Sequence, residues 1–139
     1  MNFVESRLLG VHIDDSGTDV VLSFLDAEGR PFHLNLHGVE KLLVSEMRQQ
    51  NIVEDVVLWR QGVTRPGFRE AAFPLLAGVN ESDASDQLSK LIDLAEGRVF
   101  RGELELLEIT AVFGAQVLAS FAKAEFFEGR PVPPGTSNP

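Results

Sequence analysis

The sequence predicts an α+β domain, made mostly of an antiparallel β-sheet with one clear helix packed on it. Two patterns predict this class. The segments 20–25 and 31–37 flank a Gly-containing turn, and apolar and polar residues alternate in the second of them, which is typical of a hairpin with one buried face. The segment 83–95 instead carries apolar residues at helical spacing. We expect about five to seven strands around this helix.

Three more segments of the N-terminal half bear on the sheet. The segment 7–13 is predicted as the first strand, and it ends at an Asp- and Gly-containing turn over 14–17. The segment 39–50 fits the spacing of a helix and that of a strand, so both alternatives stay open. The segment 51–59 is rich in β-branched residues and ends in an aromatic residue, which predicts a strand.

One helix is predicted in the C-terminal half, after a connection over 61–79 that Gly and Pro punctuate. Either Asn80 or Ser82 can cap its N-terminus, and acidic residues in the first turn complement the helix dipole. Gly97 can end it with a left-handed cap, which predicts a helix over 83–95. Its apolar stripe consists of Leu88, Leu91, Ile92 and Ala95.

Two segments near the C-terminus are predicted to complete the sheet. Apolar and acidic residues alternate over 103–113, but the phase slips at Leu107, which predicts a β-bulge there. The segment 116–121 is predicted to turn back as a strand, with Val117, Ala119 and Phe121 on one face. A helix over 115–127 is the alternative, because this region is rich in Ala and Lys.

The length and composition of the chain indicate one globular domain. The 139 residues are enough to bury a core, and 44% of them are hydrophobic. We therefore expect a single domain over 1–129, followed by a Pro-rich, loose tail over 130–139. The sequence contains no cysteine, which excludes disulfides, thiolate zinc sites and a thiol nucleophile.

The charge of the chain bears on its partners and its compartment. The chain has 12 basic and 21 acidic residues, for a formal net charge of −9. Nucleic acids and anionic membrane surfaces bind through Lys and Arg, so neither is an expected partner. No signal peptide is recognisable and no segment is apolar over about 20 residues, so we expect a cytoplasmic protein. A basic protein is the partner that such a charge favours.

The three histidines are the candidate metal ligands. His33 and His37 alternate with the apolar residues of the second hairpin strand and are expected on its solvent-facing side. Their separation of four residues places them about 13 Å apart along a strand, which is too far for one metal ion. A site therefore requires His12 from a neighbouring strand together with a carboxylate. We predict no cofactor from these residues.

Two clusters of charged residues are candidate binding sites. Arg60, Arg65 and Arg69 lie in a segment with two glycines and can hold a phosphate or a carboxylate. Acidic residues on the predicted strand over 103–113 are the candidate contacts for a basic partner. They are Glu103, Glu105 and Glu108. No nucleophile elbow, Ser-x-x-Lys pair or His-Glu-x-x-His helix occurs, which argues against an enzyme.

Two short apolar runs, from Gly38 to Val53 and from Phe113 to Leu118, resemble those of small bacterial β-rich proteins of uncharacterised function. Some relatives of that type resemble immunity proteins of polymorphic toxin systems. The resemblance covers about a third of the chain and implies strands within 39–59 and 104–122. It carries no catalytic signature and assigns no functional residue to this sequence.

These observations predict a non-enzymatic protein-interaction domain, such as an immunity-like inhibitor that binds a basic protein. The alternative is a small-molecule or metal-dependent enzyme that uses His12, His33 or His37, with the arginine segment holding an anion. A homo-oligomer whose sheet edges pair with one another is a third alternative.

Overall fold

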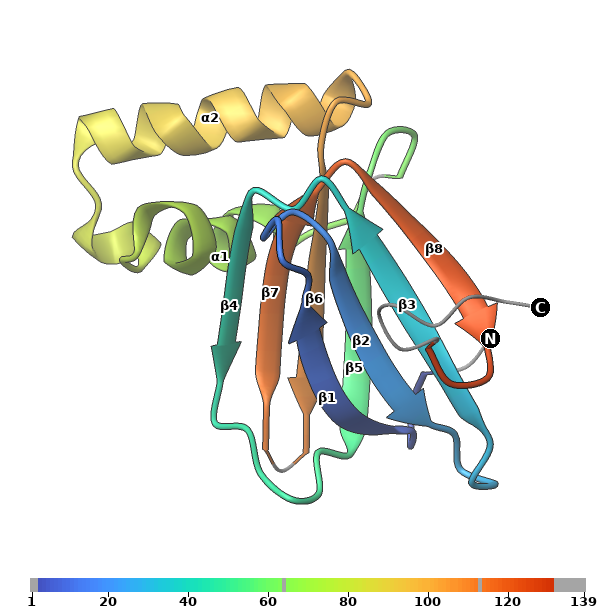
Figure 1. Cartoon of the computed structure of the whole chain (residues 1–139). Coiled ribbons are helices and arrows are strands. Elements are labelled where there is room, and N and C mark those ends of the chain that lie inside the picture. Colours follow the sequence, from blue (N-terminus) through green and yellow to red (C-terminus); the bar gives the residue numbers. More distant parts are fainter. Residues whose placement is uncertain (1–2, 64, 113, 132–139) are drawn as a thin grey trace.

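The computed structural model describes residues 3–63, 65–112 and 114–131, which form two four-stranded antiparallel sheets and a helical layer (Figure 1). The first sheet consists, in order, of β1 (Arg7–Ile13), β2 (Val20–Leu25), β3 (Pro31–His37) and β8 (Lys123–Glu128). The second sheet consists, in order, of β4 (Lys41–Ser45), β7 (Gln116–Phe121), β6 (Glu105–Ala111) and β5 (Val53–Trp59). The predicted α+β class is confirmed, with eight strands in the described residues instead of five to seven.

The two sheets pack face to face around an apolar core. The predicted hairpin is present, since Phe24 of β2 pairs with Phe32 of β3 and their rings stack with centroids 4.8 Å apart. The inward face predicted for β7 is also present, because Val117, Ala119 and Phe121 are all buried in this core. Alternation with a period of two therefore identified the inward faces of both sheets.

Two paired strands pass together from one sheet into the other. Residues 38–40 separate β3 from β4, and Ala122 alone separates β7 from β8. The Ala122 N–H donates to the His37 carbonyl at 2.9 Å. Gly38 has φ +66°, and a Cβ there would lie 3.0 Å from the Ala122 Cβ, so glycine permits this close approach. On the opposite side, Arg7 bridges Ile52 in an antiparallel contact. The two sheets are thus joined on both sides, as in a barrel.

A helical layer covers part of the outer face of the second sheet (Figure 1). The short helix α1 (Phe68–Ala72) continues into a turn of π-helix, η1 (Phe73–Ala77), and a 3₁₀ turn, η2 (Glu81–Asp83), leads to α2 (Asp86–Phe100). The prediction of an irregular connection over 61–79 is therefore wrong for 68–77. Five-residue helical segments are too short to show a periodic stripe, and their apolar residues reveal their role only when packed on the sheet.

The predicted helix is present, but it begins and ends later than 83–95. Ser85, and not Asn80 or Ser82, is the cap, because its Oγ accepts a hydrogen bond from the Leu88 N–H at 3.3 Å. The helix continues past Gly97 as far as Phe100, and Val99 in its last turn is buried. Packing of this turn outweighs the low helix propensity of glycine.

The phase slip at Leu107 is not a bulge, which corrects the prediction. Strand β6 keeps a regular register with β7 and with β5 through Leu106, Leu107 and Glu108. Both faces of β6 are buried here, since Leu106 packs under the helical layer and Leu107 faces the core between the sheets. The register shift in this pair lies in β5, between Val53 and Asp55.

The segments that were open between strand and helix are strands. The segment 39–50 contains β4, and the region 115–127 contains β7 and most of β8, so the alternative helix is wrong in both. Phe113 and the tail from 132 onward lie outside the described residues. Among the helices of the described part, none is long and apolar enough to cross a membrane.

Candidate functional site

The candidate site is the outer face of the second sheet, at and beside its helical cover. Asp55, Val57 and Trp59 alternate along β5 and point to this face, so they span about 13 Å of it. Trp59 is buried against Phe68 of α1, with ring centroids 6.1 Å apart. Asp55 is exposed at the other end of the strand. One face therefore carries an apolar end under the helices and an acidic end open to solvent.

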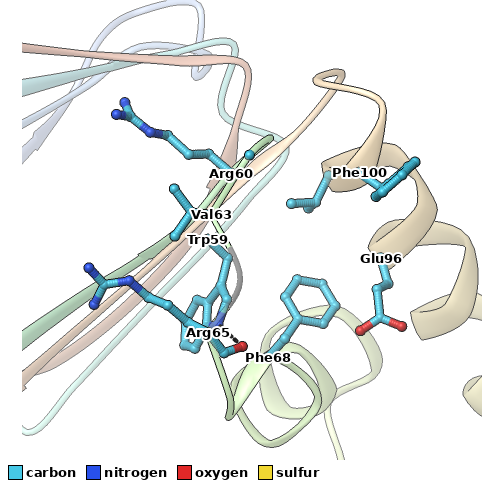
Figure 2. Close-up of a pocket in the computed structure, with 9 residues that line it drawn as sticks. Trp59, Arg60, Val63, Arg65, Phe68, Glu96 and Phe100 are labelled. Atoms are coloured by element: carbon cyan, nitrogen blue, oxygen red, sulfur yellow. Dashed lines mark hydrogen bonds between the residues drawn. The ribbon is translucent and has the colours of Figure 1, made fainter.

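A pocket of about 280 Å³ opens where the helical layer meets the end of β5 (Figure 2). Its walls are mainly apolar and come from three segments. These are the end of β5 with the loop after it (Trp59 and Val63), the start of α1 (Phe68) and the end of α2 (Val99 and Phe100). The Nε1–H of Trp59 is 3.3 Å from the backbone carbonyls of both Arg65 and Pro66, which fixes the ring beside the loop. This arrangement forms a concave apolar surface at the junction of strand, loop and helix.

The three predicted glutamates do not share one exposed face. Glu103 precedes β6 and pairs with Arg101, whose Nε lies 2.8 Å from its Oε2. Glu105 and Glu108 are both half-buried, but three positions apart on a strand they point to opposite sides of the sheet. Glu108 is on the outer face and lies diagonally across from Asp55. The acidic surface of this face therefore consists of Glu108, which was a predicted site residue, and Asp55 of β5, which was not.

The electrostatic environments of Glu105 and Glu108 are unfavourable for charge. Burial raises the pKa of Glu108, the hydrogen bond from Gln116 lowers it, and the neighbouring Asp55 raises it again. Burial likewise raises the pKa of Glu105, which the positive charge of Arg60 partly offsets. Neither carboxylate takes part in a salt bridge within the described residues. In the free protein their negative charge is only partly compensated.

Replacing Glu108 with glutamine is expected to stabilise the protein at neutral pH by about 0.5 kcal/mol, since solvent screens a half-exposed charge. Because the pKa of Glu108 is raised, the folded state binds more protons than the unfolded state between pH 4.5, the ordinary value of this group, and the higher pKa of the folded state. Charged Glu108 therefore lowers the free energy of unfolding. This penalty grows as the pH rises through the range between the two pKa values, and it is absent below pH 4.5. Urea unfolding of the Glu108→Gln variant from pH 4 to pH 8 measures this.

The control for that experiment is Glu54→Gln, which removes the same charge from an exposed position of β5. A gain in stability for Glu108→Gln that is as large at pH 4 as at pH 8 would contradict an electrostatic origin. An equal gain in the control would instead point to the change in net charge.

The three arginines are not brought together. Arg69 is committed elsewhere, because its Nε lies 3.0 Å from Glu81 and its Nη1 lies 2.6 Å from Asp93. Arg60 and Arg65 both border the pocket, but Figure 2 shows their guanidinium groups directed away from Phe68 and Phe100. A shared anion site of all three residues is therefore not formed.

The three histidines lie on the outer side of the first sheet without converging. His33 is only 9% exposed and stacks on Phe127 of β8, with ring centroids 5.2 Å apart, so its predicted solvent exposure is wrong. The side chain of His37 lies between two carboxylates, with Nε2 2.8 Å from Glu125 and Nδ1 3.6 Å from Asp19.

His12 is exposed on β1, where it pairs with Val21 of β2. It therefore lies in the row of Asn35 and not in the row of either other histidine. Among the described residues no group of three His, Cys, Asp or Glu side chains could hold a metal ion.

Sequence reasoning singled out Arg60 and Arg65 at the border of the pocket, but it did not identify the aromatic residues Phe68 and Phe100 as site residues. Phe68 is the first residue of a helix that is too short to show periodicity, and Phe100 lies off the apolar stripe of α2. The available signal was that Val99 lies four residues after Ala95, so the helical spacing of apolar residues continues past Gly97 as far as Phe100. Comparison of the chain with protein-family models, with curated proteins and with solved structures found no match.

Proposed function

We propose that this protein is a non-enzymatic interaction domain that binds a basic partner protein over Asp55 and Glu108, in the manner of an inhibitor or immunity protein. The surface concerned is the open part of the outer face of β5 and β6. We place this interaction in the cytoplasm, as expected for a chain of this composition. The net charge of −9 favours a basic partner by long-range attraction.

One observation carries the proposal: Glu108 is half-buried beside Asp55, without a salt bridge in the described part of the chain. Three other acidic residues, Glu40, Glu81 and Asp93, do find an arginine partner at 2.6–3.0 Å. A carboxylate that is partly desolvated beside a second carboxylate raises the free energy of the protein on its own. A lysine or arginine of a partner, placed between the two groups, would remove this penalty on binding.

The outer side of the first sheet, which carries the three histidines, supports an enzyme less well than the second sheet supports an interaction domain. His33 is held by stacking on Phe127 and by a 2.9 Å contact between its Nδ1 and the Gly129 carbonyl. His37 is held between Asp19 and Glu125. Both imidazoles thus have structural contacts that account for their positions, and they face away from the pocket at Trp59.

The proposal is tested by affinity capture from a lysate of the source organism with the wild-type chain and the double variant Asp55→Asn/Glu108→Gln. We expect one basic protein at near-equal amount with the wild type, and at least about tenfold less with the variant. Raising the salt from about 0.05 M to 0.3 M should also reduce recovery. The purified partner is then titrated against both chains by calorimetry.

The charge-matched control is Asp15→Asn/Asp83→Asn, which neutralises two exposed carboxylates outside the second sheet. It should capture the partner as well as the wild type does. Recovery that falls equally in both double variants would show an effect of net charge alone. Recovery of no partner, or of one unaffected by Asp55→Asn/Glu108→Gln, would overturn the proposal.

A further inference from the structure

We infer that the pocket at Trp59, Phe68 and Phe100 receives a long cationic side chain, lysine or arginine, from the basic partner, with its charged end at Glu96. This inference rests on the proposed function and assigns a second anchor point to the same interface. The pocket lies at the Trp59 end of the β5 face that carries Asp55, about 13 Å along the strand, so one partner can reach both the pocket and Asp55.

The walls of the pocket suit the stem of such a side chain. Phe100 is 82% exposed at the end of α2, so most of its ring is available to another molecule. Trp59 and Phe68 line the opposite side of the pocket, where they are 4% and 7% exposed, so Phe100 offers most of the aromatic surface. The methylene groups of lysine or arginine pack on such surfaces while the charged end stays in water, and a cation over an aromatic ring is attracted to it.

Three charged residues border the pocket, namely Glu96, Arg60 and Arg65, and the orientation of each side chain decides which charge a bound group meets. Glu96 is the carboxylate that borders the pocket; it is exposed and takes part in no salt bridge within the described residues. Its neighbour on α2, Asp93, is by contrast held by Arg69 at 2.6 Å. The guanidinium groups of Arg60 and Arg65 point away from Phe68, Glu96 and Phe100 (Figure 2). The charged group that remains beside Phe68 and Phe100 is thus negative.

The single tryptophan of the chain makes the test direct, because its indole N–H gives one resolved signal in a ¹H–¹⁵N correlation spectrum. The full chain is titrated with three capped tripeptides that carry lysine, norleucine or glutamate between two glycines. Norleucine keeps the apolar stem of lysine and lacks the ammonium group. We expect the lysine peptide to shift the Trp59 indole signal with millimolar affinity, the norleucine peptide to bind about three- to fivefold more weakly, and the glutamate peptide not to bind.

Variants then separate the contributions of charge and shape. Glu96→Gln should reduce the affinity for the lysine peptide to that for norleucine, and Phe100→Ala should weaken both. Asp86→Asn is the matched control, because it removes a charge from the same helix about 15 Å away and should change neither affinity.

Equal binding of the lysine and norleucine peptides, or no shift of the indole signal with lysine, would overturn the inference. So would a Glu96→Gln variant that binds the lysine peptide as the wild type does. These outcomes are distinguishable from failure of the proposed function, since capture of the partner and its dependence on Asp55 and Glu108 are measured separately. A partner captured through those residues, with no response at Trp59 to the lysine peptide, would retain the proposed function and remove the pocket from it.

Discussion

Replacing Asn51 with alanine is expected to lower the free energy of unfolding by about 3–4 kcal/mol. Asn51 is 1% exposed, and its side chain hydrogen-bonds to three separate segments of the chain. Its Nδ2 donates to the carbonyls of Leu8 at 3.1 Å and Arg48 at 2.8 Å. Its Oδ1 accepts from the N–H groups of Arg48 at 2.9 Å and Ala115 at 3.0 Å. Truncation to alanine removes the hydrogen-bond partner of four backbone groups, several of which are shielded from water.

The backbone around Asn51 shows that no other side chain can replace it easily. Gly114 has φ +101°, and a Cβ at that position would collide with Oδ1 of Asn51. The turn between β6 and β7 is thus built against the asparagine, and the same residue ties β1 to the chain before β5. Loss of these bonds should loosen the side of the fold where the two sheets are joined through Arg7 and Ile52.

Urea unfolding followed by circular dichroism measures the effect of Asn51→Ala. The matched control is Asn80→Ala, since Asn80 is exposed and its side chain makes no capping hydrogen bond. The control should lie within about 0.5 kcal/mol of the wild type. An equally small effect for Asn51→Ala would contradict the structural role assigned to its four hydrogen bonds.

Replacing Phe73 with alanine is expected to cost about 3–5 kcal/mol and to loosen the helical layer. Phe73 is fully buried at 0% exposure, in the core cluster that joins Leu106 and Leu118 of the sheet to Ile92 of α2. The guanidinium carbon of Arg69 lies 5.4 Å from the centre of its ring, which adds a cation–π contact. The truncation leaves a large cavity beneath α2 that the rigid sheet cannot close.

Phe100→Ala is the control for this prediction, because Phe100 belongs to the same layer but is 82% exposed. It should change the free energy of unfolding by no more than about 0.5 kcal/mol. Hydrogen exchange of the α2 amides should increase in Phe73→Ala and not in Phe100→Ala. Similar losses of stability in both variants would mean that Phe100 is structural, which would remove the main reason for regarding it as a binding residue.

The strand pattern was determined by the sequence itself. A period of two identified the hairpin of β2 and β3 and the inward face of β7, because alternate side chains of a strand face opposite environments. The apolar stripe of α2 likewise predicted a helix, although its cap and its end were misplaced. These are local patterns, in which each residue reports on its own neighbours in the sequence.

Alternation of apolar and polar residues failed as a guide where both faces of a strand are covered. Leu106 and Leu107 are both buried, one under the helices and one between the sheets, and the sequence signal of this arrangement is the same as that of a bulge. His33 was predicted on the solvent side, but Phe127 covers it from the neighbouring strand β8. No local pattern reveals which side of a strand another segment will cover.

The candidate site depends wholly on tertiary structure. Glu108 was identified from the sequence, but its partner on the same face, Asp55, comes from a strand that is more than 50 residues away in the chain. The pocket combines Trp59, Phe68 and Phe100 from a strand, a short helix and the end of a long helix. Sequence alone determined which residues are apolar or charged and how strands alternate. Only the tertiary structure decided which of them meet: the pairing of β5 with β6 joins Asp55 to Glu108, and the packing of the helical layer on the second sheet forms the pocket. Contact between distant segments is set by how strands pair and how covered faces fit together, which no local pattern contains.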